Sequence, residues 1–229
     1  MHRRSRHLNP AHAGATMALD SRFITGVSSG TGLQTWSSRS RATESLTQAT
    51  SARRPIYTLG LSGGQPGVVF TSASQHWMIR SGAIISATLS RYSIITCGAV
   101  AYTQTSDNTF LGAYASAFFT LAKEKTVYLN VVIATPASSV RAESLSGSQA
   151  ITQGGRSGAN TIFARDTNGI RATASGGGSS VDLSTTRNSS TPDGYYNGTH
   201  YAVSVFLTDI SDSLANRIMH SYILSFKII

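Results

Sequence analysis

The sequence is poor in charged residues, and acidic residues are the scarcest of them. Its 229 residues include 10 Asp and Glu against 19 Lys and Arg, and charged residues make up 13% of the chain. Hydrophobic residues make up 40%, so the surface must consist largely of Ser, Thr, Gly and Asn. This composition is typical of β-rich, loop-rich proteins and argues against an all-helical fold. An all-β sandwich of this length commonly forms one domain with a sizeable core.

Three further absences restrict the possible functions. No run approaches the ~18 consecutive apolar residues of a membrane span, so no membrane partner is expected. No apolar segment follows Arg3, Arg4 and Arg6, so the N-terminus does not resemble a secretion signal. Cys97 is the only cysteine, which excludes an internal disulfide and predicts a buried, inert thiol in a strand.

The acidic residues are also badly placed for hydrolytic chemistry. Glycoside hydrolases need two carboxylates flanking the scissile bond, and no two acids occupy alternate positions of an expected strand. The close pair Asp209 and Asp212 lies at the expected start of a helix, where interaction with the helix dipole explains it better. No His lies in a nucleophile-elbow sequence. We therefore expect no catalytic residues and no enzymatic activity.

No metal or cofactor site is expected either. His2, His7 and His12 lie in a segment without periodicity, and the chain has no Cys–His spacing suited to zinc. The loops around Asp107 and Asp193 carry one carboxylate each, which is too few for a calcium ion.

Short β-rich runs recur along the chain at the spacing of a β-sandwich. Expected strands cover residues 67–70, 76–79, 83–90, 92–103, 109–121, 126–135, 139–145, 160–166, 169–175, 180–184 and 199–207. The run 126–135 is apolar almost throughout, which predicts a central strand covered on both faces. Asn168-Gly169 predicts a type I′ hairpin turn. The segments 147–158 and 176–198 are expected to be long, polar loops.

Helical periodicity appears only near the C-terminus. Four residues spaced four apart form one apolar stripe: Leu214, Ile218, Tyr222 and Phe226. Ser211 is a suitable N-cap for this helix. The alternative is a final strand from Tyr222 to Ile229, which would use the same apolar residues.

The net charge of +9 is concentrated near the N-terminus. Residues 1–54 carry eight Arg against Asp20 and Glu44, which gives +6. Residues 1–20 lack periodicity and are predicted to form an extended basic arm without a core of its own. Residues 21–229 are then the folded domain.

On this interpretation hydrophobic runs able to form a core begin near Phe23, and residues 1–18 can be deleted without loss of stability. Two roles stay open for the arm. Arg3, Arg4 and Arg6 can dock it on an acidic partner, or the arm can be a solvated tail that keeps the protein soluble.

An ordered set of residues resembles a known group of domains. The set comprises Trp36, Gln48, Ala49, Thr50, Arg54, Pro55, Gly64, Pro66, Val68 and Phe70. In this order the chain is similar to concanavalin A-like (laminin-G-like) jelly-roll domains of bacteriophage virion proteins. The segment Tyr222-Ile-Leu-Ser-Phe-Lys227 resembles the helix that closes them. Ser37 and Ser38 replace the usual aspartate after the Trp.

The resemblance implies an all-β, concanavalin A-like jelly-roll sandwich with a short C-terminal helix. It further implies a non-enzymatic virion structural protein, in first place a capsid decoration (cement) or head-surface protein. Its partners would be other virion proteins, with the major capsid protein favoured, and the chain would form a homo-oligomer, a trimer or a dimer. It would reside in the virion, with Arg3, Arg4 and Arg6 in the docking arm.

The alternative is a lectin-like carbohydrate- or receptor-binding module of a phage tail appendage. Trp77, Tyr195, Tyr196 and Asn197 offer a possible platform for a host glycan. Nucleic-acid binding ranks below both, because no aromatic residue interleaves the N-terminal arginines and no known reader motif is present.

Overall fold

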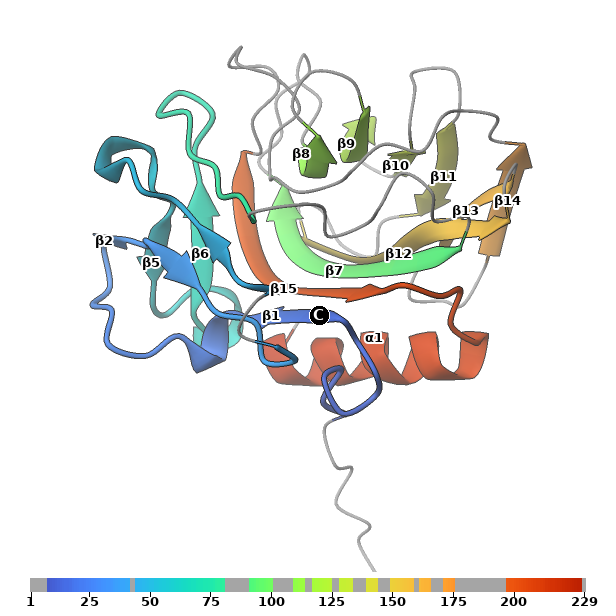
Figure 1. The fold of residues 1–229 in the computed structure, drawn as a ribbon, viewed down its shortest axis with the longest axis horizontal. Helices are drawn as coiled ribbons and strands as arrows, with labels where there is room; N and C mark the ends of the chain where they lie inside the picture. The colour runs from blue at the N-terminus through green and yellow to red at the C-terminus, as the bar shows by residue number, and fades with distance from the viewer. Residues whose placement is uncertain are drawn as a thin grey trace, which may run out of the picture.

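The chain folds into antiparallel β-sheet with one C-terminal helix (Figure 1). This computed structural model describes residues 8–41, 44–80, 91–100 and 197–227. Between residues 101 and 196 it describes the backbone of the strands whose bounds follow. The mostly-β expectation is therefore confirmed, and the helix is where the sequence predicts it.

A nine-stranded sheet forms the centre of the fold. Its order is β14-β13-β12-β7-β15-β6-β5-β2, with β1 beside β15. The strands are β1 (Met17–Asp20), β2 (Thr31–Gly32), β5 (Ile56–Thr58), β6 (Gly67–Phe70), β7 (Tyr92–Val100), β12 (Gln149–Gly158), β13 (Thr161–Arg165), β14 (Arg171–Ser175) and β15 (Gly198–Phe206). Two smaller sheets complete the described strands.

The strand β15 lies in the interior of this sheet. It pairs with β7 along its length, while its other edge is shared by β6 at residues 198–200 and β1 at residues 202–205. Residues 200–206 are buried without a break, as expected of a strand covered on both faces. The strand β15, near the C-terminus, therefore pairs with β1 and β6 from the N-terminal part of the chain.

A four-stranded sheet has the order β11-β10-β9-β8. Its strands are β8 (Thr109–Ala113), β9 (Ala117–Glu124), β10 (Tyr128–Ile133) and β11 (Ser139–Glu143). The predicted strand 109–121 thus corresponds to two strands. The predicted strand 126–135 corresponds to β10, which lies between two neighbours as expected. The short strands β3 (Thr35–Trp36) and β4 (Leu46–Thr47) pair with each other.

The helix α1 (Asp212–Phe226) confirms the C-terminal prediction. The hydroxyl of Ser211 accepts a hydrogen bond from the Leu214 N–H at 3.3 Å, which is an N-cap. Lys227 has a φ of 49° and ends the helix in the left-handed conformation. The alternative of a strand beginning at Tyr222 is wrong, because that residue lies within the helix.

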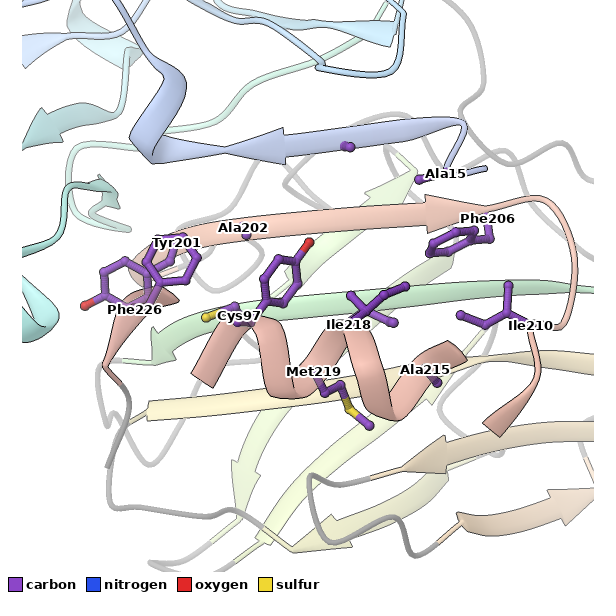
Figure 2. Packing of buried hydrophobic residues seen from close by; sticks show 13 residues of the cluster. Ala15, Cys97, Tyr201, Ala202, Phe206, Ile210, Ala215, Ile218, Met219 and Phe226 are labelled. Carbon is purple, nitrogen blue, oxygen red and sulfur yellow. The ribbon is translucent and has the colours of Figure 1, made fainter. Parts of the chain in front are cut away.

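An apolar cluster lies between α1 and the strands β1, β7 and β15 (Figure 2). Its members are Ala15, Ala18, Ile95, Cys97, Tyr201, Ala202, Phe206, Ile210, Ala215, Ile218, Met219, Tyr222 and Phe226. Leu8 and Ala11 pack against it. The helix is amphipathic for this reason, since one face must cover the sheet.

The predicted arm over residues 1–20 is wrong from Leu8 onward. Residues 17–20 form β1, pair with β15 and are buried. The Leu8 carbonyl accepts a hydrogen bond from the Ser221 hydroxyl. Phe23, where the core was expected to begin, is 51% exposed. The segment lacks visible periodicity because a four-residue strand buried on both faces shows no alternation.

Two further expectations from the sequence are wrong. Residues 149–158, predicted as a loop, form β12, which pairs with β7 and β13. Its polar, glycine-containing sequence shows no strand pattern, and its neighbours supply the stabilisation. Residues 76–79 make a single bridge from Ile79 to Thr47 instead of a strand beside β6.

The hairpin around Asn168-Gly169 is confirmed, because β13 pairs antiparallel with β14. Its turn residues, the expected strands 83–90 and 180–184, and the loop 176–196 lie outside the described residues.

Candidate functional site

The sequence-predicted site residues fall into two groups. Arg3, Arg4 and Arg6 of the docking arm, and Tyr195 and Tyr196 of the glycan platform, lie outside the described residues. Trp77 and Asn197 are described, and both are half-buried.

Trp77 and Asn197 lie at the same end of β6. Gly198 pairs with Phe70, the last residue of that strand. The chain then turns, and the Thr71 N–H donates to Nδ1 of His76 at 3.2 Å while the His76 N–H donates back to the Thr71 carbonyl at 3.2 Å. These reciprocal bonds hold residues 76 and 77 beside the strand end that Asn197 adjoins.

Hydrogen bonds hold the backbone of Trp77 on both sides. Its N–H donates to the Arg53 carbonyl at 3.2 Å, and its carbonyl accepts from Nε2 of Gln48 at 3.0 Å. Gln48 is itself buried, and its Oε1 accepts from the Thr50 N–H at 3.0 Å. A buried amide with both ends bonded fixes the segments it joins.

Arg54 completes this hydrogen-bond network. Its Nε donates to the Gln48 carbonyl at 3.0 Å, and its Nη2 donates to the Ala49 carbonyl at 2.9 Å. The Gln-Ala-Thr and Arg-Pro motifs of the resemblance are thus structural in this fold. They bind loop carbonyls and hold the Trp77 segment in place.

An ion pair holds the following residues. Arg80 contacts the largely buried Glu44 through both carboxylate oxygens, at 2.8 Å from Nε to Oε2 and 3.1 Å from Nη2 to Oε1. Thr47 and Ile79 exchange backbone hydrogen bonds of 2.8 and 2.9 Å between these two sites. An arginine that contacts both oxygens of a carboxylate fixes the relative orientation of the two side chains. Trp77 consequently lies on a segment fixed at both ends.

A second charged cluster was missed at the sequence level. The buried carboxylate of Asp20 accepts from Arg22 Nε at 2.9 Å and from Arg22 Nη2 at 2.6 Å. Arg39 reaches the same carboxylate at 3.9 Å, and its guanidinium lies 3.5 Å from the ring centroid of Phe23. Burial lowers the pKa of Arg22, but the hydrogen bond and charge of Asp20 outweigh it and raise that pKa.

This cluster joins the start of the domain to its end. Arg22 also lies over the ring of Phe226, the last residue of α1, at 4.7 Å. Cation–π contacts of this kind add modest stability. The spacing of Asp20 and Arg22 is a local signal, but the contacts with Phe226 and Arg39 could not be predicted without the fold.

Three further buried titratable groups, His200, Cys97 and Tyr222, lie in the core. His200 packs between Phe70 and Trp36, with ring centroids 4.8 and 6.4 Å away, and burial sets its pKa well below the ordinary value. Burial also raises the pKa of the Cys97 thiol well above its ordinary value, which confirms the buried-thiol prediction. The Tyr222 hydroxyl is hydrogen-bonded to Ser204, and burial raises its pKa.

The described side chains offer no metal centre, since none of them form a group of three or more His, Cys, Asp or Glu suited to an ion. Asp20 and Glu44 are both engaged by arginines. Within the described part of the chain, no helix has the length and apolar character needed to cross a membrane.

No protein-family model and no curated protein matches this sequence. The fold is similar to solved structures at low identity. An arabinofuranosidase complexed with arabinofuranosyl-α-1,2-xylobiose superposes with a TM-score of 0.64 at 13% identity, over 94% of this chain and 65% of that chain. Domain 4 of AbnA, a GH43 extracellular arabinanase from Geobacillus stearothermophilus, in complex with arabinotriose, superposes at 0.56 and 12% identity, over 90% and 98%.

A Trypanosoma rangeli sialidase in complex with sialic acid gives a TM-score of 0.55 at 12% identity. The match covers 90% of this chain, which spans about a third (33%) of the sialidase. At such identities the similarity shows the fold alone. That fold is one found in domains of carbohydrate-active enzymes, and none of these three proteins is a bacteriophage protein.

Proposed function

We propose that this chain is a non-catalytic β-sandwich module, of concanavalin A-like jelly-roll topology, that binds carbohydrate. The observation that carries the proposal is the match to domain 4 of the arabinanase, which covers 98% of that separate domain. That domain was solved in complex with arabinotriose. A lectin-like role, which the sequence offers as the alternative, is thus preferred to the capsid role.

Three of the described carboxylates support the proposed lack of catalysis. Asp20 and Glu44 are bound to arginines at 2.6 and 2.8 Å. In each pair both carboxylate oxygens contact guanidinium nitrogens, so neither carboxylate is presented to a glycosidic oxygen. Asp212 lies in the first turn of α1, where it stabilises the helix.

Binding without catalysis needs a rigid aromatic group beside polar groups. Trp77 meets the first requirement, since its segment is held by Gln48 on one side and by the Glu44–Arg80 pair on the other. Preorganised side chains lose less entropy when a ligand binds.

Calorimetric titration of the full chain with arabinotriose tests this function. We expect saturable binding, and we expect no release of reducing sugar after prolonged incubation with the same oligosaccharide. Absence of binding to arabinotriose and to arabinofuranosyl-α-1,2-xylobiose would reject the proposal. Cleavage abolished by changing one Asp or Glu would reject its non-catalytic part.

The second candidate is the virion structural role. It is supported by the ordered residues of the resemblance and by the +6 charge of residues 1–54. Replacing Arg3, Arg4 and Arg6 with Ser should then abolish incorporation into particles and leave the fold intact. The isolated chain should also sediment as a trimer or dimer. A monomer whose triple variant still assembles would contradict this role.

A further inference from the structure

An exposed aromatic ring and an arginine lie together beside the strand β1. The Phe23 side chain is 51% exposed. The guanidinium of Arg39 lies 3.5 Å from the centroid of this ring and is itself partly exposed. Since Phe23 stays half exposed with Arg39 against it, the two residues present an apolar surface and a positive charge side by side. We call them the Phe23–Arg39 pair.

The charge of Arg39 is not neutralised by its neighbours in the cluster. Arg22 makes both short contacts with the Asp20 carboxylate, at 2.9 Å from Nε to Oδ1 and 2.6 Å from Nη2 to Oδ2. Arg39 lies 3.9 Å from Oδ2, too far for a hydrogen bond. One carboxylate and two guanidiniums leave a net charge of +1. In the described part of the chain, the Arg39 guanidinium contacts this distant carboxylate and the Phe23 ring, so its N–H groups can donate to a ligand.

Hydrogen bonds hold the backbone of both residues in place. The Arg39 N–H donates to the Ala18 carbonyl of β1 at 2.8 Å. Phe23 ends a single 3₁₀ turn, and the Ser21 hydroxyl of that turn donates to the Pro66 carbonyl at 2.6 Å. A ligand would therefore meet the two side chains on segments that need no reordering, which lowers the entropy cost of binding.

The Phe23–Arg39 pair and Trp77 lie at opposite ends of β6. Pro66, to which the turn of Phe23 is bonded, immediately precedes this strand. Trp77 lies beside Phe70, the last residue of the strand. Four residues of a strand span about 13 Å, so the Phe23–Arg39 pair is a site of its own.

We propose that the Phe23–Arg39 pair binds an acidic sugar, a saccharide unit that carries a carboxylate. An exposed aromatic ring packs against the C–H face of a sugar ring, and a guanidinium binds both oxygens of a carboxylate in one plane. That the ligand is a sugar rests on the proposed carbohydrate function. That the sugar is charged rests on the excess positive charge of the cluster.

The test is calorimetric titration of the full chain with trigalacturonate and with its methyl ester, which has the same rings without the charge. We expect the wild type to bind trigalacturonate at least about tenfold more tightly than the ester. Arg39→Met should remove this preference, and Phe23→Ala should weaken the binding of both probes severalfold. Arg41→Met is the matched control, because it removes one positive charge from the same exposed loop and should bind both probes like the wild type.

Arabinotriose separates this site from the proposed function. If the wild type binds arabinotriose but not trigalacturonate, the carbohydrate function stands and the acidic-sugar site is wrong. If the wild type binds neither of these sugars nor arabinofuranosyl-α-1,2-xylobiose, both proposals fall.

The variants provide further ways to overturn the acidic-sugar site. An unchanged preference for trigalacturonate in Arg39→Met, or an equal loss in Arg41→Met, would contradict it. Equally tight binding of an oligoglutamate peptide, lost in Arg39→Met and Phe23→Ala, would also contradict it, because the pair would then be a docking surface for acidic proteins. Should Phe23→Ala fail to fold, the comparison of Arg39→Met with Arg41→Met decides.

Discussion

Two regions of this molecule are stabilised by different physical means. Where α1 covers β1, β7 and β15, the contacts are apolar and the side chains are almost fully buried. In residues 44–80 the strands are two to four residues long. There, the Gln48 network and the Glu44–Arg80 pair hold the chain.

The difference teaches how each region serves the fold. Burial of apolar surface gives a large, non-directional gain in free energy. It therefore stabilises the packing of β1 and α1 without requiring one geometry at each contact. Hydrogen bonds contribute less each, but they specify distance and direction. The segment that carries Trp77 is accordingly defined in position by bonds that add little to the total stability.

The largest expected effect comes from removing the N-terminal part of the apolar region. Deletion of residues 1–18 removes half of β1 and the contacts of Leu8 and Ala11 with the apolar cluster beneath α1. We expect loss of cooperative thermal unfolding, which calorimetry measures. Deletion of residues 1–7 spares every described contact and should change the melting temperature little. An unchanged melting temperature after the longer deletion would restore the arm interpretation.

A single core truncation should have the next largest effect. Ile218 of α1 has no exposed surface, so Ile218→Ala should lower the free energy of unfolding by about 2–5 kcal/mol. Leu224→Ala is the matched control on the same helix, because Leu224 is 43% exposed and should cost within about 0.5 kcal/mol. If urea titrations gave the same loss of unfolding free energy for both variants, the cluster would not be what stabilises the fold.

Acid should weaken the fold through His200, which is buried against Phe70 and Trp36. Burial lowers its pKa well below 6.5, and burial also lowers the pKa of His76. A histidine with a lowered folded-state pKa stabilises the fold above its unfolded value, and this stability is lost as pH falls below that value. We expect a loss of roughly 1–2 kcal/mol between pH 7 and 5.

The measurement is urea unfolding of the wild type and His200→Gln across this pH range. The variant should be less stable at pH 7 and should have a shallower pH dependence. An equally steep dependence in the variant would assign the effect to other groups.

A single substitution in the hydrogen-bonded region, residues 44–80, should lower the free energy of unfolding by a smaller amount. Gln48→Ala leaves the Trp77 carbonyl and the Thr50 N–H without the amide that binds them. We expect a loss of about 1–2 kcal/mol and faster hydrogen exchange in residues 77–80. Gln34→Ala is the control, since the Gln34 side chain is exposed. No difference between the two variants would mean that water replaces the network at no cost.

The smallest predicted effect is at the helix cap. Ser211→Ala removes the acceptor of the Leu214 N–H and should cost about 1 kcal/mol. Ser213→Ala, one position into the helix and exposed, should be neutral or slightly stabilising because Ala favours helices. A larger loss at Ser213 would place the cap elsewhere.

The surroundings of the proposed glycan platform were only partly predictable. Residue type alone marks Trp77 and Asn197 as candidates, and they lie at one end of β6. No local pattern indicated that Gln48 and Arg54 would hold the Trp77 segment, because these bonds join residues up to 29 positions apart. Contacts set by the tertiary structure leave no periodic trace in a sequence.

The sequence by itself determined the local features: the α1 stripe, its Ser211 cap, most strands and the buried Cys97. These follow from periodicity and from interactions within a few residues. Only the tertiary structure decided that residues 17–20 pair with β15 and that residues 149–158 form β12. Strand pairing joins distant segments, and its register is set by the partner strands and the faces they bury.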